Sequence, residues 1–148
     1  QIDACILNGP NITKAQTAGY AKVITQVGDI IPYQTSAIFF SPDFVKKDDI
    51  AVRFLRAYVK ACNYYYDAAI DKKSPEKLEE VIKIIAKYTN APVEDVKLGL
   101  PYIDRNGKLL DSDIKTQIEW YSSHNMINGK LDPAQVVNTS FLEKALKK

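Results

Sequence analysis

The sequence is poor in the residues from which catalytic and metal sites are usually built. Its 148 residues include one histidine, His124, and two cysteines, Cys5 and Cys62. A single histidine offers no Ser–His–carboxylate or Cys–His set by spacing. There is also no P-loop, G-x-G-x-x-G, H-E-x-x-H or C-x-x-C motif. We therefore predict a protein that is not an enzyme and that needs no cofactor and no metal.

The two cysteines are too few for a disulfide framework. Cys5 lies in an apolar run, and Cys62 lies on the apolar face of an expected helix. Both positions favour buried free thiols. A disulfide between the two residues stays open as the alternative.

Long apolar runs and a strong charge of one sign are also lacking. No run approaches the roughly 18 apolar residues needed to span a bilayer. The net charge of +2 is too small to indicate nucleic acid as the main partner. The chain opens on Gln1-Ile2-Asp3-Ala4, without Met, without a visible signal peptide and already inside an apolar run. We expect a fragment or a processed chain.

The first 40 residues carry the pattern of short strands. Residues 2–8 are almost continuously apolar, which is typical of a buried parallel strand. Residues 12–20 have the character of a short helix, and residues 21–27 alternate and are rich in β-branched side chains. This order predicts a β–α–β unit. A further strand is expected over residues 36–40.

After residue 45 the pattern becomes helical. Apolar residues recur at spacings of three and four over 48–71, which predicts a long amphipathic helix. Ser74 and Pro75 supply an N-cap and a first-turn proline for the next helix, which we expect to end near residue 88. Further helices are expected over residues 92–98, 112–125 and 139–147.

The first candidate ligand site is the turn that ends the first expected strand, formed by Asn8, Gly9, Pro10 and Asn11. Ligands of open α/β sheets lie outside the carboxyl ends of the strands, where the next helix directs free N–H groups. The two asparagines offer side-chain amides, and the glycine permits close approach of the backbone. The turn therefore predicts a site for a small anion or a ligand with a carboxylate, sulfonate or amide group. A capped turn without a ligand is the alternative.

The second candidate is the polar stretch that precedes the strand expected over 36–40. It consists of Tyr33, Gln34, Thr35 and Ser36. It lies where the strand-bearing start of the chain passes into the helical remainder. Segments at such a crossing absorb hinge rotation and often line the cleft. We predict that these residues bind ligand, and an ordinary connecting loop is the alternative.

Four segments in order carry a family resemblance. They are I-D-A-C-I-L-x-x-P over 2–10, GDIIPYQTSAIFFSPDFVKKDDIAVRFLRAYVKACNYY over 28–65, LPYIDRNGKLLDSDIKTQIEWYSSHNMI over 100–127 and VVNTSFLEKALK over 136–147. Together they resemble ABC-transporter substrate-binding proteins of the nitrate/sulfonate/taurine type, which include binders of thiamine-pyrimidine precursors.

The resemblance implies an α/β protein with the type II periplasmic-binding-protein fold, in which two lobes close around a ligand. This chain would be its C-terminal portion, mostly helical after residue 45. Residues 1–31 would end the second lobe, and residues 32–36 would form the hinge crossing. Residues 37–148 would form the C-terminal part of the first lobe with its outer helices.

The resemblance also implies a function without chemistry. The protein would capture a small anionic or polar solute, such as a sulfonate, nitrate, a carboxylate or a pyrimidine-like compound. It would deliver that solute to the transmembrane permease subunits of an ABC importer. Its partners would include the missing N-terminal half of the same protein. Its place would be the periplasm or another extracytoplasmic space, free or lipid-anchored.

Two other functions stay open on the same resemblance. One is an enzyme of the thiamine-pyrimidine synthesis type, although this chain lacks the cysteine-rich segment of those enzymes. The other is a sensory ligand-binding domain that feeds a regulator.

Overall fold

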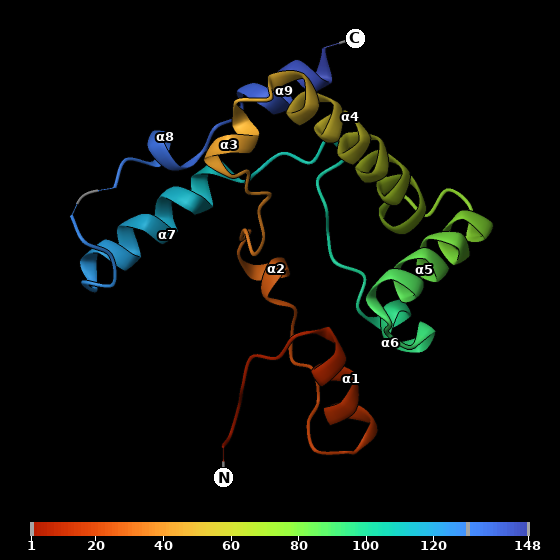
Figure 1. The fold of residues 1–148 in the computed structure, drawn as a ribbon. Helices are drawn as coiled ribbons and strands as arrows, with labels where there is room; N and C mark the ends of the chain where they lie inside the picture. Colours follow the sequence, from red (N-terminus) through yellow and green to blue (C-terminus); the bar gives the residue numbers. More distant parts are fainter. Residues whose placement is uncertain (1, 130, 148) are drawn as a thin grey trace. The chain divides into compact units, whose positions relative to one another are not determined.

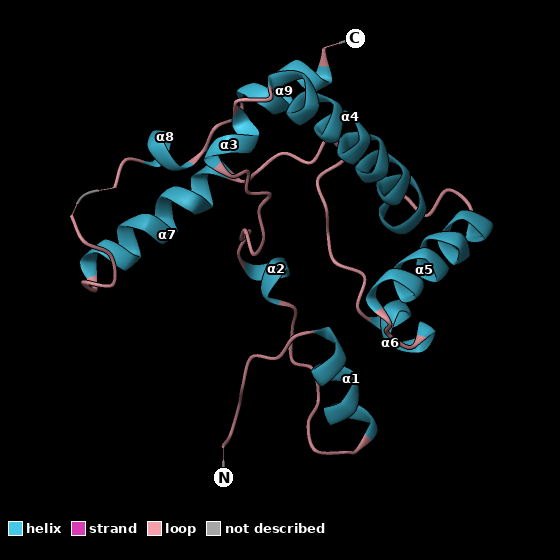
Figure 2. Cartoon of the chain, viewed as in Figure 1, coloured by secondary structure: helices cyan, strands magenta, loops and turns pink. Residues whose placement is uncertain are grey.

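A computed structural model describes residues 2–129 and 131–147, and its regular structure is helical (Figures 1 and 2). No β-strand occurs among these residues. The elements are α1 (Gly9–Thr17), α2 (Val27–Ile30), α3 (Pro42–Val45), α4 (Asp48–Tyr65), the π-helix η1 (Tyr66–Ile70), α5 (Pro75–Thr89), α6 (Val93–Leu98), α7 (Asp111–Ser123), α8 (Pro133–Val136) and α9 (Ser140–Leu146).

The predicted α/β fold of the periplasmic-binding-protein type is therefore wrong for this chain. The expected strands over 2–8 and 36–40 have neither helix nor strand structure, and the one over 21–27 is irregular until α2 begins. No backbone hydrogen bond joins these three segments to one another in the described part of the chain. A strand is stable only beside a partner that pairs its N–H and C=O groups. An apolar, β-branched sequence alone does not supply that partner.

The helical predictions agree with the structure. The stretch expected over 48–71 forms α4, which continues directly into η1. Ser74 caps α5 as expected, because its hydroxyl accepts a hydrogen bond from the backbone N–H of Lys77, and Pro75 occupies the first turn. The helix α5 ends at Asn90, a residue in the left-handed conformation with φ of 54°.

The helix α1 begins three residues before its expected start. Pro10 lies within its first two positions, where a residue without an N–H costs no helical hydrogen bond. The side chain of Pro10 lies outside the described part of the structure.

The chain divides into two compact units, and each is built from two separated segments. The first unit combines the segment up to Gln26 with Tyr64–Ile103, and the second combines Val27–Asn63 with the segment from Asp104 onward. The chain thus passes from one unit to the other three times.

The core of the first unit forms where η1 meets α5. Tyr65, Ala68, Ala69 and Val81 are buried there, and the Tyr65 hydroxyl donates a 2.5 Å hydrogen bond to the carbonyl of Pro101. Partly buried apolar side chains surround this cluster, including Leu78, Ile85, Leu100 and Ile103. The helix α6 packs against both α5 and α1.

The second unit is organised around α4. Ala51, Val52 and Leu55 are buried on one face of this helix. Phe40 contacts the rings of three other phenylalanines, at centroid distances of 4.9, 5.7 and 6.1 Å, and these partners are Phe44, Phe54 and Phe141. Lys144 of α9 forms an ion pair with Asp48 at the start of α4. The last described helix is thereby fastened to the first turn of the longest one.

Within the described residues, none of the helices combines the length and the apolar character that crossing a bilayer demands.

Candidate functional site

The turn at Asn8 is organised by its own two asparagines. The Asn8 carbonyl accepts hydrogen bonds from the backbone N–H groups of Asn11 and Ile12, both at 3.0 Å. The Asn11 side-chain amide donates to the side-chain oxygen of Asn8 at 2.8 Å, and both residues are exposed. No described residue accepts a hydrogen bond from the Asn8 side-chain NH₂ or from the second N–H of the Asn11 amide, so both remain as donors at the start of α1. Such donors match an acceptor group on a ligand.

Gly9 has a packing role in this turn. A Cβ atom added at Gly9 would lie 3.2 Å from the Cα atom of Gly99, which follows α6. Two glycines therefore allow the start of α1 and the end of α6 to approach closely. The sequence predicted close backbone approach at Gly9, but it gave no indication that the neighbour is protein backbone.

Gln34 is bonded within the second unit through all four of its polar groups. Its backbone N–H donates to Asp113 at 2.6 Å, and its side-chain oxygen accepts from the N–H of Leu110 at 2.9 Å. Its side-chain NH₂ donates to the Ser36 carbonyl at 2.5 Å, and its own carbonyl accepts from the Gln117 side chain at 2.9 Å. Gln34 thus fastens the stretch before residue 36 to the start of α7.

The other residues of the second predicted site are exposed. Tyr33 exposes 47% of its surface, and Thr35 and Ser36 are also exposed. Asn8–Asn11 belongs to the first compact unit, whereas Tyr33–Ser36 belongs to the second. The predicted ligand-binding roles of both sets stay predictions.

Asp113 and Gln117 are polar residues that the sequence reasoning missed. The Gln117 side chain donates to the Asp113 carboxylate at 2.6 Å, and both side chains are half-buried. They lie four residues apart on α7, a spacing that places two side chains on one face of a helix. That spacing is a visible signal, but their partner Gln34 lies far away in the sequence.

The two cysteines differ in environment. Cys62 is buried, as predicted, whereas the prediction of a buried Cys5 is wrong, because Cys5 is exposed on an irregular segment. Both are free thiols. Burial is the main cause that raises the pKa of Cys62, and a hydrogen bond with Tyr58 opposes that shift. A thiol that stays protonated is a poor nucleophile, so Cys62 fits a structural role.

A charged cluster follows the π-helix. Lys73 lies 2.9 Å from Asp67 and 3.2 Å from Asp71. Hydrogen bonds with these two carboxylates, Asp67 first, raise the pKa of Lys73. The lysine is therefore compensated locally, which leaves little attraction for a free anion.

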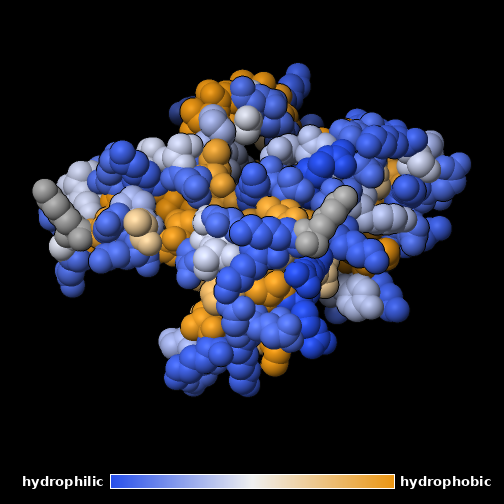
Figure 3. Space-filling model, turned by 90° about the horizontal axis from the view of Figure 1, so that it is seen from above, coloured by the Kyte–Doolittle hydropathy of each residue, from blue (hydrophilic) through white to orange (hydrophobic). Residues whose placement is uncertain are grey.

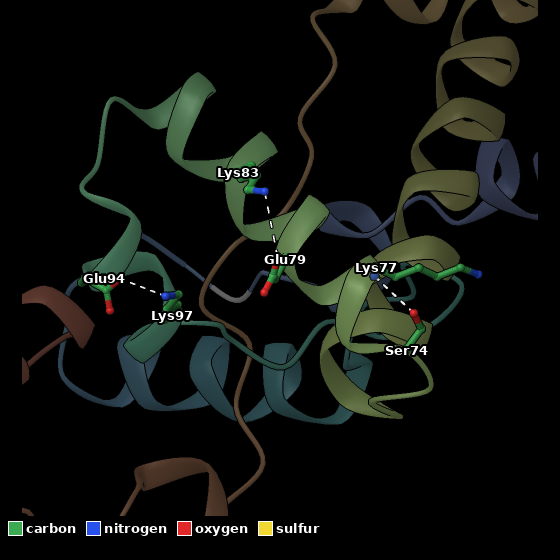
Figure 4. Close-up of polar contacts among 6 residues, drawn as sticks. All are labelled: Ser74, Lys77, Glu79, Lys83, Glu94 and Lys97. Carbon is green, nitrogen blue, oxygen red and sulfur yellow. Dashed lines mark hydrogen bonds and ion pairs between the residues drawn. The ribbon is translucent and has the colours of Figure 1, made fainter.

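The exposed charges of α5 and α6 are paired in the same manner (Figure 4). Lys83 lies 3.9 Å from Glu79, and Lys97 lies 2.9 Å from Glu94. Surface pairs of this kind are screened by solvent and contribute little to stability. Because each of these lysines lies beside a glutamate, the paired positions do not form a surface of uniform charge.

No family model, no curated protein and no solved structure matches this chain. Any site must therefore be judged from its own residues. The described residues contain no group of three or more His, Cys, Asp or Glu side chains that could hold a metal ion. Of the two predicted sites, the Asn8 turn keeps hydrogen-bond donors that no described residue uses, whereas Gln34 is already bonded inside the protein. The first arrangement can bind a polar group, and the second supports the fold.

Proposed function

We propose that this chain belongs to the solute-binding component of an ABC importer and that it binds a small polar or anionic compound for delivery to a permease. The observation that carries the proposal is the order of the four resembling segments, which extend from residue 2 to residue 147. On this proposal the protein acts in the periplasm or another extracytoplasmic space, either free or lipid-anchored.

The Asn8 turn supports the binding part of the proposal. Two side-chain amides lie together at the start of α1, and they keep N–H donors that no described residue accepts. Nitrate, sulfonates and carboxylates present several acceptor oxygens, and amide donors bind such oxygens directionally. The same donors also suit the carbonyl oxygens of a pyrimidine-like compound.

Exposed apolar side chains support the participation of a further polypeptide. Four large residues on irregular segments of the first unit expose between 77% and 89% of their surface, namely Ile2, Ile6, Tyr20 and Ile24. Figure 3 shows apolar side chains reaching the surface beside hydrophilic ones. We take these exposed apolar side chains as a site of interaction with another polypeptide. We assign it to the N-terminal half of the same protein, which covers these side chains and completes the ligand site.

The test is calorimetric titration of the chain together with its N-terminal half against taurine, nitrate, benzoate and a thiamine-pyrimidine precursor. We expect saturable binding of at least one compound and recovery of that compound unchanged. Chemical turnover of the bound compound would instead support the alternative of an enzyme. If none of the four compounds binds, the proposal is contradicted.

A matched pair of variants tests the site. Asn8→Ala removes donors from the turn and should weaken binding roughly tenfold or more, because a hydrogen bond to a charged group contributes about 1.5–3 kcal/mol. Asn138→Ala is the matched control, because Asn138 is also an exposed asparagine beside a helix start. Its side-chain oxygen accepts a hydrogen bond from the N–H of Ser140, the first residue of α9. This substitution should leave the affinity unchanged. Equal effects of the two substitutions would reject the Asn8 turn as the site.

A further inference from the structure

The chain contains three Asn-Gly pairs, and the structure holds them in three different ways. They are Asn8-Gly9, Asn106-Gly107 and Asn128-Gly129. In an Asn-Gly pair the backbone nitrogen of the glycine can attack the side-chain amide carbon of the asparagine, because glycine has no side chain to obstruct the approach. The reaction requires that nitrogen and that side chain to be free to meet.

Asn106-Gly107 is held within a closed turn. The Gly107 N–H donates to the Asp104 carbonyl at 2.9 Å. The Asp104 carboxylate accepts from the N–H groups of Asn106 at 2.9 Å and Lys108 at 3.0 Å. The nitrogen that would attack is therefore already bonded, and the residues on either side of it are held by one carboxylate.

Asn8-Gly9 is held through its side chain and its packing. The Asn8 side-chain oxygen accepts from Asn11, and its backbone carbonyl accepts two hydrogen bonds at the start of α1. Gly9 lies against Gly99, so closely that an added Cβ would be 3.2 Å from the Gly99 Cα atom. Reaction at this pair requires α1 to open at its first turn.

Asn128-Gly129 shows none of these restraints within the part of the chain that the structure describes. Both residues are exposed, and neither makes a hydrogen bond to another described residue. A Cβ atom added at Gly129 would meet nothing within 4 Å. We propose that Asn128 is the site at which the folded chain deamidates spontaneously.

The step is balanced without an oxidant or a reductant. The Gly129 nitrogen forms a bond to the Asn128 side-chain carbon, and the bond from that carbon to the side-chain nitrogen breaks. Ammonia leaves and carries away the proton of the Gly129 N–H. Water then opens the resulting five-membered imide at either carbonyl, which gives aspartate or isoaspartate. Full conversion adds one negative charge and changes the net charge from +2 to +1.

The experiment compares the three pairs within one sample. The native chain is incubated at mildly alkaline pH and digested. The peptides are separated, and mass spectrometry detects the replacement of the side-chain NH₂ by OH in each of the three peptides. We expect Asn128 to react roughly tenfold faster than Asn106 or Asn8, because opening either of the held turns breaks at least one further hydrogen bond. Equal native rates at Asn128 and Asn106 would overturn the proposal.

Two controls separate structure from sequence. In concentrated urea the three pairs should react at similar rates, because all share the same glycine neighbour. A large advantage of Asn128 that persists in urea would show that the fold is not its cause. Asp104→Ala, checked for a folded circular dichroism spectrum, should accelerate reaction at Asn106 and leave Asn128 unchanged. No acceleration at Asn106 would reject the role of the closed turn.

Discussion

The contact between Gly107 and Tyr58 allows the most quantitative test of the second unit. Gly107 has a φ of +67°, and a Cβ atom added there would lie only 2.3 Å from a ring carbon of Tyr58. Substitution by alanine therefore has two separate costs. The left-handed backbone costs about 1–2 kcal/mol for a residue with a side chain, and overpacking against the ring costs about 1–3 kcal/mol. We expect Gly107→Ala to lower the free energy of unfolding by about 2–5 kcal/mol in all.

Gly129 provides the matched control in the same unit. Its φ of +77° gives the same backbone cost, but a Cβ atom there would have nothing within 4 Å. Gly129→Ala should therefore lose only about 1–2 kcal/mol. Urea unfolding followed by circular dichroism measures both values. Equal losses for the two variants would refute the contact.

A double-mutant cycle isolates the ring as the cause. Tyr58→Leu removes the ring atoms that Cβ would meet, so Gly107→Ala in that background should cost no more than Gly129→Ala does alone. A cost that stays as large as in the presence of Tyr58 would place the strain elsewhere.

Three further predictions concern stability. Gln34→Ala loses two side-chain hydrogen bonds and should lower the free energy of unfolding in urea by about 1–3 kcal/mol. The neighbouring Thr35→Ala should have no effect, and equal losses would contradict the Gln34 network. Burial is the largest cause that raises the pKa values of Tyr58 and Tyr65 from 10.0 to about 12. Folding favours the neutral forms of both tyrosines. Their contribution to the free energy of unfolding is therefore complete below pH 10 and is lost between pH 10 and 12. Tyr65→Phe should reduce the decrease in melting temperature between pH 10 and 12. If the decrease is unchanged, burial of the Tyr65 hydroxyl is not its cause. Lys72 has a φ of 52°, so Lys72→Gly should stabilise by about 1 kcal/mol in thermal unfolding, and destabilisation would be the contrary result.

The helical part of the fold could be predicted because its signals are local. Apolar spacing indicates α4, and Ser74 with Pro75 marks the start of α5 within one residue. These signals depend on residues three or four positions apart. The structure adds the change from α-helix to π-helix at Tyr66, for which the sequence gives no visible sign.

The strand predictions were wrong because a sheet depends on distant partners. Residues 2–8 have the composition of a buried strand, yet Ile6 exposes 84% of its surface and no strand lies beside it in the described residues. The candidate sites show the same limit. Asn8 and Asn11 lie three positions apart in one turn and were identified together, whereas the bond between Gln34 and Asp113 joins residues 79 positions apart.

The interleaved segments of the two units have a consequence for the order of folding during synthesis. The two segments assigned to the first unit have both been made once Ile103 is added, although Val27–Asn63 separates them. The second unit waits for α9, because Phe141 contacts Phe40 and Lys144 pairs with Asp48. Domains generally fold as units while the chain emerges from the ribosome. The first unit can therefore form co-translationally. At that stage α4 has been synthesised, but the second segment of its unit, which begins at Asp104, has not.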